Sequence, residues 1–198
     1  MILKKACAIT LALSILSGTA ALAATDTNNK QNSIDAQYQL QKFSKEISLT
    51  QYTYSNAPED VRKIYEENCK AIGKEVNAND VIYVPSENKL SNNMIGKSVN
   101  ATASSSYYVY KNGDRIDTNL SGSYSYFYID STYVGYNYIT NGLPVSALQY
   151  LLTWYGYDVG VIDGIFGPKT HSALLNYQRN NGLSVDAICG PNTWRSFF

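Results

Sequence analysis

Histidine is almost absent from this chain of 198 residues, which contains only His171. A hydrolytic zinc site needs several His and carboxylate ligands that converge on one metal ion. One histidine does not provide such a ligand set, so we assign no metal and no cofactor. The scarcity of histidine therefore argues against a zinc hydrolase.

Cysteine is also scarce, with three copies in the chain. Cys189 lies near His171, but a thiol nucleophile also needs a group that orients its histidine, and none is evident. Cys189 stands where Phe166 stands in an earlier copy of the same motif, and Cys69 falls on the apolar side of a predicted helix. We expect two buried apolar thiols. A disulfide between them remains open, because export to an oxidising compartment would permit it.

The chain has no excess charge of either sign, with 16 basic and 16 acidic residues. Nucleic acids and anionic membranes are bound through clusters of Lys and Arg, and no such cluster occurs here. Carboxylates remain as candidates for a glycosidase, which needs only two of them. The candidates are Glu59, Asp60, Glu66, Glu67 and Asp80. Most belong to a predicted helix surface, where acidic side chains are usually only solvated.

The N-terminus carries an apolar run from Ala6 to Leu16, preceded by Lys4-Lys5 and followed by Ala21-Leu22-Ala23. This order is typical of a secretory signal peptide with cleavage after Ala23. The run is short for a membrane span, so we expect no stable membrane anchor. Cleavage removes two of the 16 basic residues and leaves the mature chain weakly acidic.

One short motif occurs twice near the C-terminus. Residues 163–170 read Asp-Gly-Ile-Phe-Gly-Pro-Lys-Thr, and residues 186–193 read Asp-Ala-Ile-Cys-Gly-Pro-Asn-Thr. In each copy an acidic tight turn leads through Gly into Pro, which is favoured at the first position of a helix. The repeat therefore predicts two successive helix starts, at Pro168 and Pro191.

Three helices are expected in this region. The first opens at Pro144 and carries apolar residues at spacings of three and four as far as Gly156. The second runs from Pro168 to Asn181-Gly182, a pair suited to left-handed termination. The third begins at Pro191, and its large side chains can fill the space between the first two helices. These side chains are Trp194, Phe197 and Phe198.

Many residues between 143 and 198 follow one spaced pattern without a gap. They are Leu148-Gln149, Leu152, Gly156-Tyr157, Gly160, Asp163-Gly164, Phe166-Gly167, Thr170, Ala173-Leu174, Tyr177-Gln178, Gly182-Leu183, Asp186, Gly190 and Thr193-Trp194. In this pattern the stretch resembles the type 1 peptidoglycan-binding domain, a three-helix module that targets proteins to the cell wall. The resemblance implies a helical domain that binds peptidoglycan.

Three residues depart from the family pattern. Ala187 replaces the Gly of the second Asp-Gly pair, which questions the left-handed geometry of that turn. Cys189 stands at an apolar position. Trp154 stands where the family is variable, and we expect it either to meet the Tyr-rich region or to stack on ligand.

In the rest of the chain we identify no family pattern from the sequence. Residues 24–54 are rich in Asn, Gln, Ser and Thr, which predicts a flexible polar linker, with a helix from Ser33 to Ile47 as the alternative. Pro58 to Ile72 has apolar residues at helical spacing and ends before Gly73, so it predicts an amphipathic helix. Asp80 to Pro85 predicts a short strand.

Residues 106–140 alternate Tyr with small or polar residues and contain nine of the 18 tyrosines. This pattern and the turn signal Asn112-Gly113 predict an antiparallel meander. The expected strands are Tyr107 to Lys111, Arg115 to Asn119, Tyr124 to Ile129 and Tyr133 to Ile139. Tyr124, Tyr126 and Tyr128 must share one face. We favour that face as the core of the sheet over an exposed platform for sugar stacking.

The expected fold class is α+β. A signal peptide (1–23) and a linker (24–54) precede a small α+β region (55–142) and a helical peptidoglycan-binding-like domain (143–198). We expect a secreted, non-catalytic protein of the cell wall with peptidoglycan as its partner. Two alternatives are a wall hydrolase with its catalytic site in the N-terminal region and a coat-type protein that assembles through its tyrosines. The oligomeric state is left open.

The candidate ligand-binding residues lie beside the acidic turns. They are Tyr155, Tyr157, Asp163, Phe166 and His171. Each also has a purely structural interpretation. Asp163 is suited to closing its own turn, and Phe166 is suited to the core.

Overall fold

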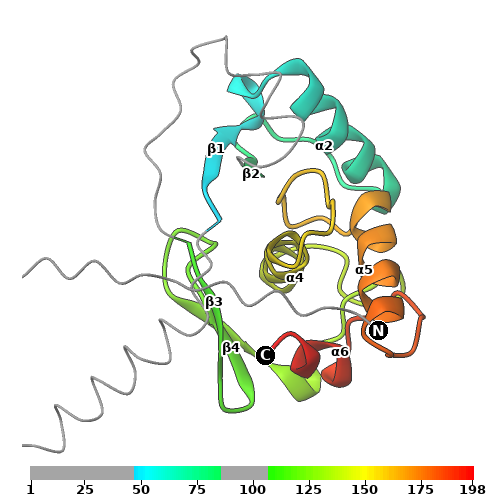
Figure 1. Ribbon diagram of the computed structural model, residues 1–198. Helices are drawn as coiled ribbons and strands as arrows, with labels where there is room; N and C mark the ends of the chain where they lie inside the picture. The colour runs from blue at the N-terminus through cyan, green and yellow to red at the C-terminus, as the bar shows by residue number, and fades with distance from the viewer. Residues whose placement is uncertain (1–46, 86–106) are drawn as a thin grey trace, which may run out of the picture. The chain divides into compact units, whose positions relative to one another are not determined.

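Two small antiparallel sheets and several α-helices form the part of the chain that the computed structural model describes, residues 47–85 and 107–198 (Figure 1). This mixed content confirms the α+β fold class. The predicted signal peptide, most of the predicted linker and the alternative helix from Ser33 lie outside the described residues. Within the described ranges, every helix is too short or too polar to cross a membrane.

The first sheet pairs β1 (Leu49–Thr53) with β2 (Val81–Pro85) in antiparallel register, with Leu49 opposite Pro85. A short 3-10 turn, η1 (Tyr54–Asn56), follows β1. The prediction of a linker as far as residue 54 was therefore wrong at its end. Only Leu49 and Tyr52 of β1 are buried, and its partner strand comes much later in the chain, so the local composition looked like that of a linker.

The amphipathic helix was predicted correctly. It is α2 (Glu59–Ile72), and Gly73 ends it with a left-handed φ of 69°. Its inner side buries Val61, Tyr65 and Cys69 against both strands of the first sheet. Val161 and Ile165 join the same core cluster, so this helix also packs on the C-terminal part of the chain.

The second sheet is a meander of β3 (Val109–Asn112), β4 (Arg115–Thr118) and β5 (Ser125–Tyr128). These strands confirm the first three that the sequence predicted. The preferred interpretation of Tyr124, Tyr126 and Tyr128 as the core of the sheet was wrong, because their exposed fractions are 53%, 47% and 56%. Val109, Ile116 and Phe127 occupy the opposite, inward face and supply the apolar contacts instead.

The fourth predicted strand, Tyr133 to Ile139, does not form. A 3-10 turn, η2 (Ile129–Ser131), follows β5, and the chain then leaves the sheet. Val134 makes an isolated antiparallel bridge with Cys189 in the second copy of the motif. In this segment Val134 therefore pairs with a distant turn and not with β5.

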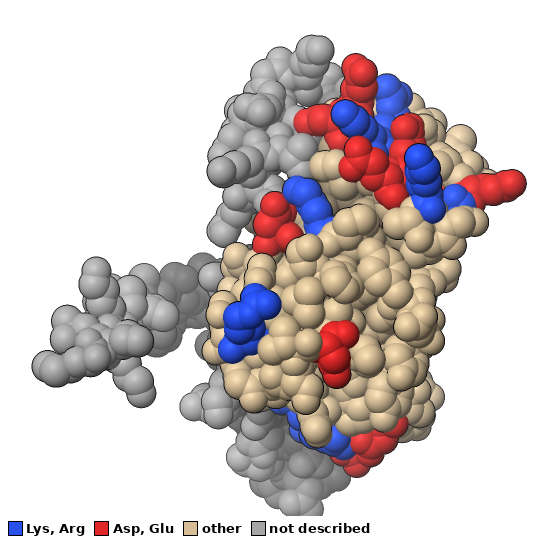
Figure 2. Space-filling model, turned by 90° about the vertical axis from the view of Figure 1, so that its right-hand side faces the viewer, with Lys and Arg blue, Asp and Glu red and all other residues tan. Residues whose placement is uncertain are grey.

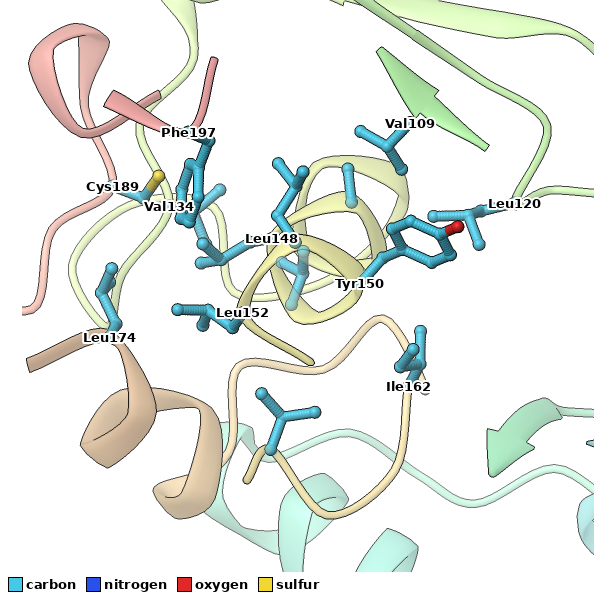
Figure 3. Close-up of a cluster of buried hydrophobic side chains, with 14 of the residues drawn as sticks. Val109, Leu120, Val134, Leu148, Tyr150, Leu152, Ile162, Leu174, Cys189 and Phe197 are labelled. Carbon is cyan, nitrogen blue, oxygen red and sulfur yellow. The ribbon is translucent and has the colours of Figure 1, made fainter. Parts of the chain in front are cut away.

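Two of the three C-terminal helices begin at the predicted proline, and the first begins one residue before Pro144. The three helices are α4 (Leu143–Trp154), α5 (Pro168–Asn180) and α6 (Pro191–Ser196). Leu148 and Leu152 of α4 meet Leu174 of α5 and Phe197 after α6 in one core cluster, which Figure 3 shows around α4. Trp154 lies half-buried against this cluster, with its ring 4.9 Å from that of Tyr155.

The same core cluster contains residues from both sides of the domain boundary expected at residue 143. Val109 and Ile116 from the second sheet, and Leu120 shortly after β4, belong to it together with the side chains of α4. Tyr150 of α4 donates a hydrogen bond of 2.9 Å to the carbonyl of Tyr107. The sheet is therefore packed directly onto the helices. Cys69 and Cys189 are both buried as free thiols, as expected for two small apolar side chains.

Candidate functional site

A buried glutamine organises the first acidic turn. The Gln149 amide nitrogen donates to the Asp163 carboxylate (2.8 Å), to the Ile165 carbonyl (3.0 Å) and to the Thr170 hydroxyl (3.1 Å). Its amide oxygen accepts the backbone N–H groups of Asp163 and Gly164. The side chain is completely buried, and one residue of α4 thereby satisfies most polar groups of the turn.

The second acidic turn repeats this arrangement around Gln178 of α5. Its amide nitrogen donates to Asp186 (2.8 Å) and to the Ile188 carbonyl (3.0 Å), and its oxygen accepts the N–H groups of Asp186 and Ala187. Ala187 has a φ of 56°, close to the 69° of Gly164. The left-handed turn that the Ala substitution placed in question is therefore kept. The repeat in the sequence is a repeat of one hydrogen-bonded structure.

The two turns differ in what covers them. Asn68 of α2 donates a hydrogen bond of 2.8 Å to Asp163, and a Cβ added at Gly167 would overlap the Asn68 side chain. Burial raises the pKa of Asp163 to about 6, although the hydrogen bonds from Gln149 and Asn68 act in the opposite direction. Asp186, by contrast, is exposed. The first turn is thus closed by a helix, and the second is accessible.

Residues 133–142 run along both turns. Val134 exchanges two backbone hydrogen bonds with Cys189, at 3.1 and 2.9 Å. Further on, Thr140 accepts the N–H of Phe166, and Asn141 forms a bridge with Ile165. The residues between these contacts form a loop that presents three exposed tyrosine rings beside the turns. These rings belong to Tyr133, Tyr136 and Tyr138.

A cleft of 680 Å³ opens between this loop and the second turn. On one side Tyr133 and Tyr138 are stacked, with ring centroids 5.6 Å apart and an interplanar angle of 28°. Tyr133 rests on Gly190, where an added Cβ would lie 2.9 Å from the tyrosine ring. The other lining residues come from residues 182–193 and include Ser184, Asp186, Ile188, Asn192 and Thr193.

Charge is nearly absent from the cleft. Asp186 is the single charged residue among those that line it. Its Oδ1 accepts hydrogen bonds from Gln178 and from the Ile188 N–H. Figure 2 shows many of the charged side chains visible from that side gathered at the top, where α2 lies, with others scattered over the rest of the surface. The cleft therefore offers ring surfaces and neutral hydrogen-bonding groups.

The five residues predicted as ligand contacts do not line this cleft. Phe166 is fully buried, and His171 is half-buried with its ring 5.2 Å from Tyr136. Tyr155 donates a hydrogen bond of 2.6 Å to the carbonyl of Phe197, and Tyr157 accepts one from Asn180. Asp163 is enclosed by Gln149 and Asn68. Most of these side chains thus have structural partners of their own.

Four residues that line the candidate cleft were not among those predicted from the sequence, namely Tyr133, Tyr138, Asp186 and Asn192. The repeat was a usable signal, because it makes Asp186 the counterpart of Asp163. The first turn, unlike the second, is covered because Asn68 of α2 packs on it. Asn68 lies 95 residues before Asp163 in the chain, so no local sequence signal shows this contact. The tyrosine pair was hidden in a segment predicted as a strand.

Two family models match this chain. Both have the description "Putative peptidoglycan-binding domain", and they cover residues 43–112 and 141–196. A crystal structure of a peptidoglycan-binding protein from Clostridioides difficile, in complex with glutamine hydroxamate, is 32% identical with a TM-score of 0.66. The match covers 76% of this chain and 91% of that protein. This chain belongs to the same family of peptidoglycan-binding proteins.

The second match confirms the type 1 peptidoglycan-binding domain that the sequence analysis identified. The match at residues 43–112 was not recognised there, because β1 was taken for linker. Tyr133 and Tyr138 fall between the two matched stretches, so the aromatic side of the cleft comes from a part of the chain that neither model covers.

Hydrolases are also among the relatives. An N-acetylmuramoyl-L-alanine amidase, CwlM of Mycobacterium tuberculosis, is 49% identical over 57 residues, which are 29% of this chain and 14% of the amidase. A spore cortex-lytic enzyme of Bacillus cereus is 42% identical over 53 residues, 27% of this chain and 20% of that enzyme. The chain thus matches less than a quarter of either curated relative. Family and relatives together support binding to the cell wall.

Proposed function

We propose that this protein is a non-catalytic component of the cell wall that binds peptidoglycan in the cleft between the Tyr133–Tyr138 pair and the second acidic turn. The observation that carries the proposal is the stacked, half-exposed tyrosine pair facing a polar turn in which Asp186 is the one charged lining residue. Membership of a peptidoglycan-binding family supplies the identity of the polymer.

The cleft chemistry favours the glycan strand over the carboxylate ends of the stem peptide. Sugar rings present C–H faces that pack on aromatic rings, while their hydroxyl and acetamido groups need neutral hydrogen-bonding partners. Ser184, Asn192 and Thr193 can provide such partners. Asp186 would repel a peptide carboxylate, and the cleft contains no Lys or Arg to offset this.

A catalytic role is the second candidate, because two relatives are named as wall-degrading enzymes. The described residues contain no group of three or more His, Cys, Asp or Glu side chains that could hold a metal ion. Both described thiols are buried, and burial raises the pKa of each, which disfavours the reactive thiolate. We therefore propose binding without hydrolysis. A gel assay for wall degradation should show no clearing. Clearing by the purified protein would show that it hydrolyses the wall and would contradict this proposal.

The N-terminal pattern of a basic pair, an apolar run and Ala21-Leu22-Ala23 supports secretion of the mature chain from residue 24. Association with peptidoglycan would then hold the protein at the wall. Mass spectrometry of the mature N-terminus tests this step, since a protein that keeps Met1 at the wall contradicts cleavage.

The binding proposal is tested with the mature chain and purified, insoluble peptidoglycan. Replacing both cleft tyrosines, Tyr133→Ser with Tyr138→Ser, should weaken co-sedimentation about tenfold, as expected when central aromatic contacts are lost. Tyr136→Ser is the matched control, because Tyr136 belongs to the same loop, is similarly exposed and does not line the cleft. If the double variant sediments like the parent while its melting temperature is unchanged, the cleft is not the binding site.

A further inference from the structure

The outward face of the second sheet, opposite its buried side, is a continuous group of tyrosines. Tyr110, Asp117 and Tyr126 lie directly opposite one another in β3, β4 and β5, so their side chains share one face. Tyr124 and Tyr128 extend the row along β5, with ring centroids 6.3 and 5.7 Å from Tyr126. We call this surface, with Tyr108 and Arg115, the tyrosine face.

Arg115 and Asp117 hold the tyrosine face in place. Asp117 is completely buried beneath it and forms an ion pair with Arg115, with Nε and Oδ1 2.8 Å apart. The guanidinium lies over the Tyr126 ring, 4.8 Å from its centroid, and donates to the Tyr124 hydroxyl at 3.0 Å. The cation is therefore neutralised from below and held over the Tyr126 ring. The face has no net charge.

This composition fits a neutral, hydroxyl-rich ligand. The tyrosine face offers half-exposed rings with phenol groups at their edges, and none of its residues is aliphatic. An anionic lipid surface requires surplus positive charge, and the cation of this face, Arg115, is paired with Asp117. A sugar chain uses ring faces for its C–H groups and phenol groups for its hydroxyls.

The position of the face in the chain points to the same polymer as the cleft. β3 lies within the stretch of residues 43–112 that matches a peptidoglycan-binding domain. After Tyr128, only the turn η2 and one more residue precede Tyr133 of the cleft. A polymer of repeating sugars can engage two such surfaces at once, and two linked weak contacts bind more tightly than either one.

We propose that the tyrosine face is a second binding surface for the glycan strand of peptidoglycan, separate from the cleft. The identity of the polymer rests on the proposed function, whereas the surface itself does not. Because the rings are fixed before the ligand arrives, little side-chain freedom is lost on binding.

The test uses the mature chain with Tyr124→Thr, Tyr126→Thr and Tyr128→Thr combined, since threonine removes the ring and keeps a high preference for strand. This variant should bind an N-acetylglucosamine oligomer and purified peptidoglycan about tenfold more weakly, the loss expected for one of two linked contacts. The single variants Tyr124→Thr and Tyr128→Thr should give smaller losses, and they serve if the triple variant melts early. Tyr136→Thr is the matched control and should bind like the parent.

The two proposals fail in different ways. If the triple variant binds both probes like the parent, the second surface is wrong, even where the cleft double variant has lost binding. If the cleft double variant binds normally and the triple variant does not, the cleft is wrong and the tyrosine face stands. If the parent sediments as a dimer that the triple variant abolishes with wall binding intact, the face joins two copies of this chain and the inference is overturned.

Discussion

At the scale of single residues, the two acidic turns use the same left-handed position with different residues. Gly164 has a φ of 69°, and a Cβ added there would lie 2.8 Å from the Ser146 hydroxyl. Ala187 occupies the equivalent position with a φ of 56°. Alanine is sterically strained in this conformation, whereas glycine is not strained but loses more conformational entropy on folding.

The reciprocal substitutions should therefore behave differently. Gly164→Ala should destabilise the protein by about 1 to 2 kcal/mol from its backbone conformation alone. Ala187→Gly should change the free energy of unfolding by less than about 1 kcal/mol, because relief of the strain is offset by unfolded-state entropy. Urea denaturation of both variants measures this. A Gly164→Ala variant as stable as the parent would show that the turn does not require its left-handed residue.

A second prediction at this scale concerns Asp163 and the pH dependence of the free energy of unfolding. Its pKa is raised from 3.8 to about 6 by burial, so the folded state holds a proton that the unfolded state releases between these values. The stability that this proton contributes is complete below pH 3.8 and is lost as the pH rises through 6. From about pH 5 to pH 7 this group should lower the free energy of unfolding by about 1 kcal/mol.

Asp163→Asn removes this titration and can still accept the hydrogen bond from Gln149. The stability difference between parent and variant should therefore change between pH 5 and pH 7, and urea denaturation at both values checks it. Asp158→Asn serves as the control, because Asp158 is an exposed partner of Lys169. An equal pH response in the parent and Asp163→Asn would mean that Asp163 has an ordinary pKa.

At the scale of elements, local signals predicted what they directly encode. The positions of proline and glycine predicted the starts of α4, α5 and α6 to within a residue, and the spacing of apolar residues predicted α2. Long-range pairing was not visible in this way. β1 looked like linker because its partner β2 is remote, and residues 133–139 looked like a strand because nothing local shows that Val134 pairs with Cys189. The cleft depends on that second pairing, so it could not be predicted.

The next prediction concerns the contact between the loop of residues 133–142 and the start of α6. Gly190 precedes the first residue of α6, and the Tyr133 ring rests against it. A methyl group in Gly190→Ala would lie 2.9 Å from the ring and displace it, which should disturb its stacking on Tyr138. Since the φ of Gly190 is −96°, alanine adopts this backbone without strain.

Gly190→Ala should therefore weaken co-sedimentation with peptidoglycan several-fold while the melting temperature stays within a few degrees of the parent. Gly122→Ala is a useful contrast, because a Cβ there meets open space but requires a φ of 85°. That variant should lower stability and leave binding of the folded protein unchanged. Unaltered binding by Gly190→Ala would show that the position of the Tyr133 ring is not critical.

At the scale of the whole molecule, the charges are unevenly distributed. Residues 107–198, which carry both proposed surfaces, hold five basic and six acidic residues, while α2 alone holds seven charged residues in its 14 positions. In Figure 2 many of the visible charged side chains gather over that helix. Arg115 is paired with Asp117, Lys169 with Asp158 and Arg195 with Asp130. Little free charge is left to attract a polyanion.

Binding to the wall should therefore depend little on salt. Electrostatic binding weakens steeply with ionic strength, whereas ring stacking and neutral hydrogen bonds do not. We expect the affinity for purified peptidoglycan to change less than about threefold between roughly 0.05 and 1 M NaCl, because the Debye length falls from over 10 Å to about 3 Å without removing these contacts. Co-sedimentation of the mature chain with peptidoglycan at several salt concentrations measures this, with a Lys-rich protein as the salt-sensitive control. A loss as steep as that of the control would show that charge carries the binding, and both neutral surfaces proposed here would then be the wrong ones.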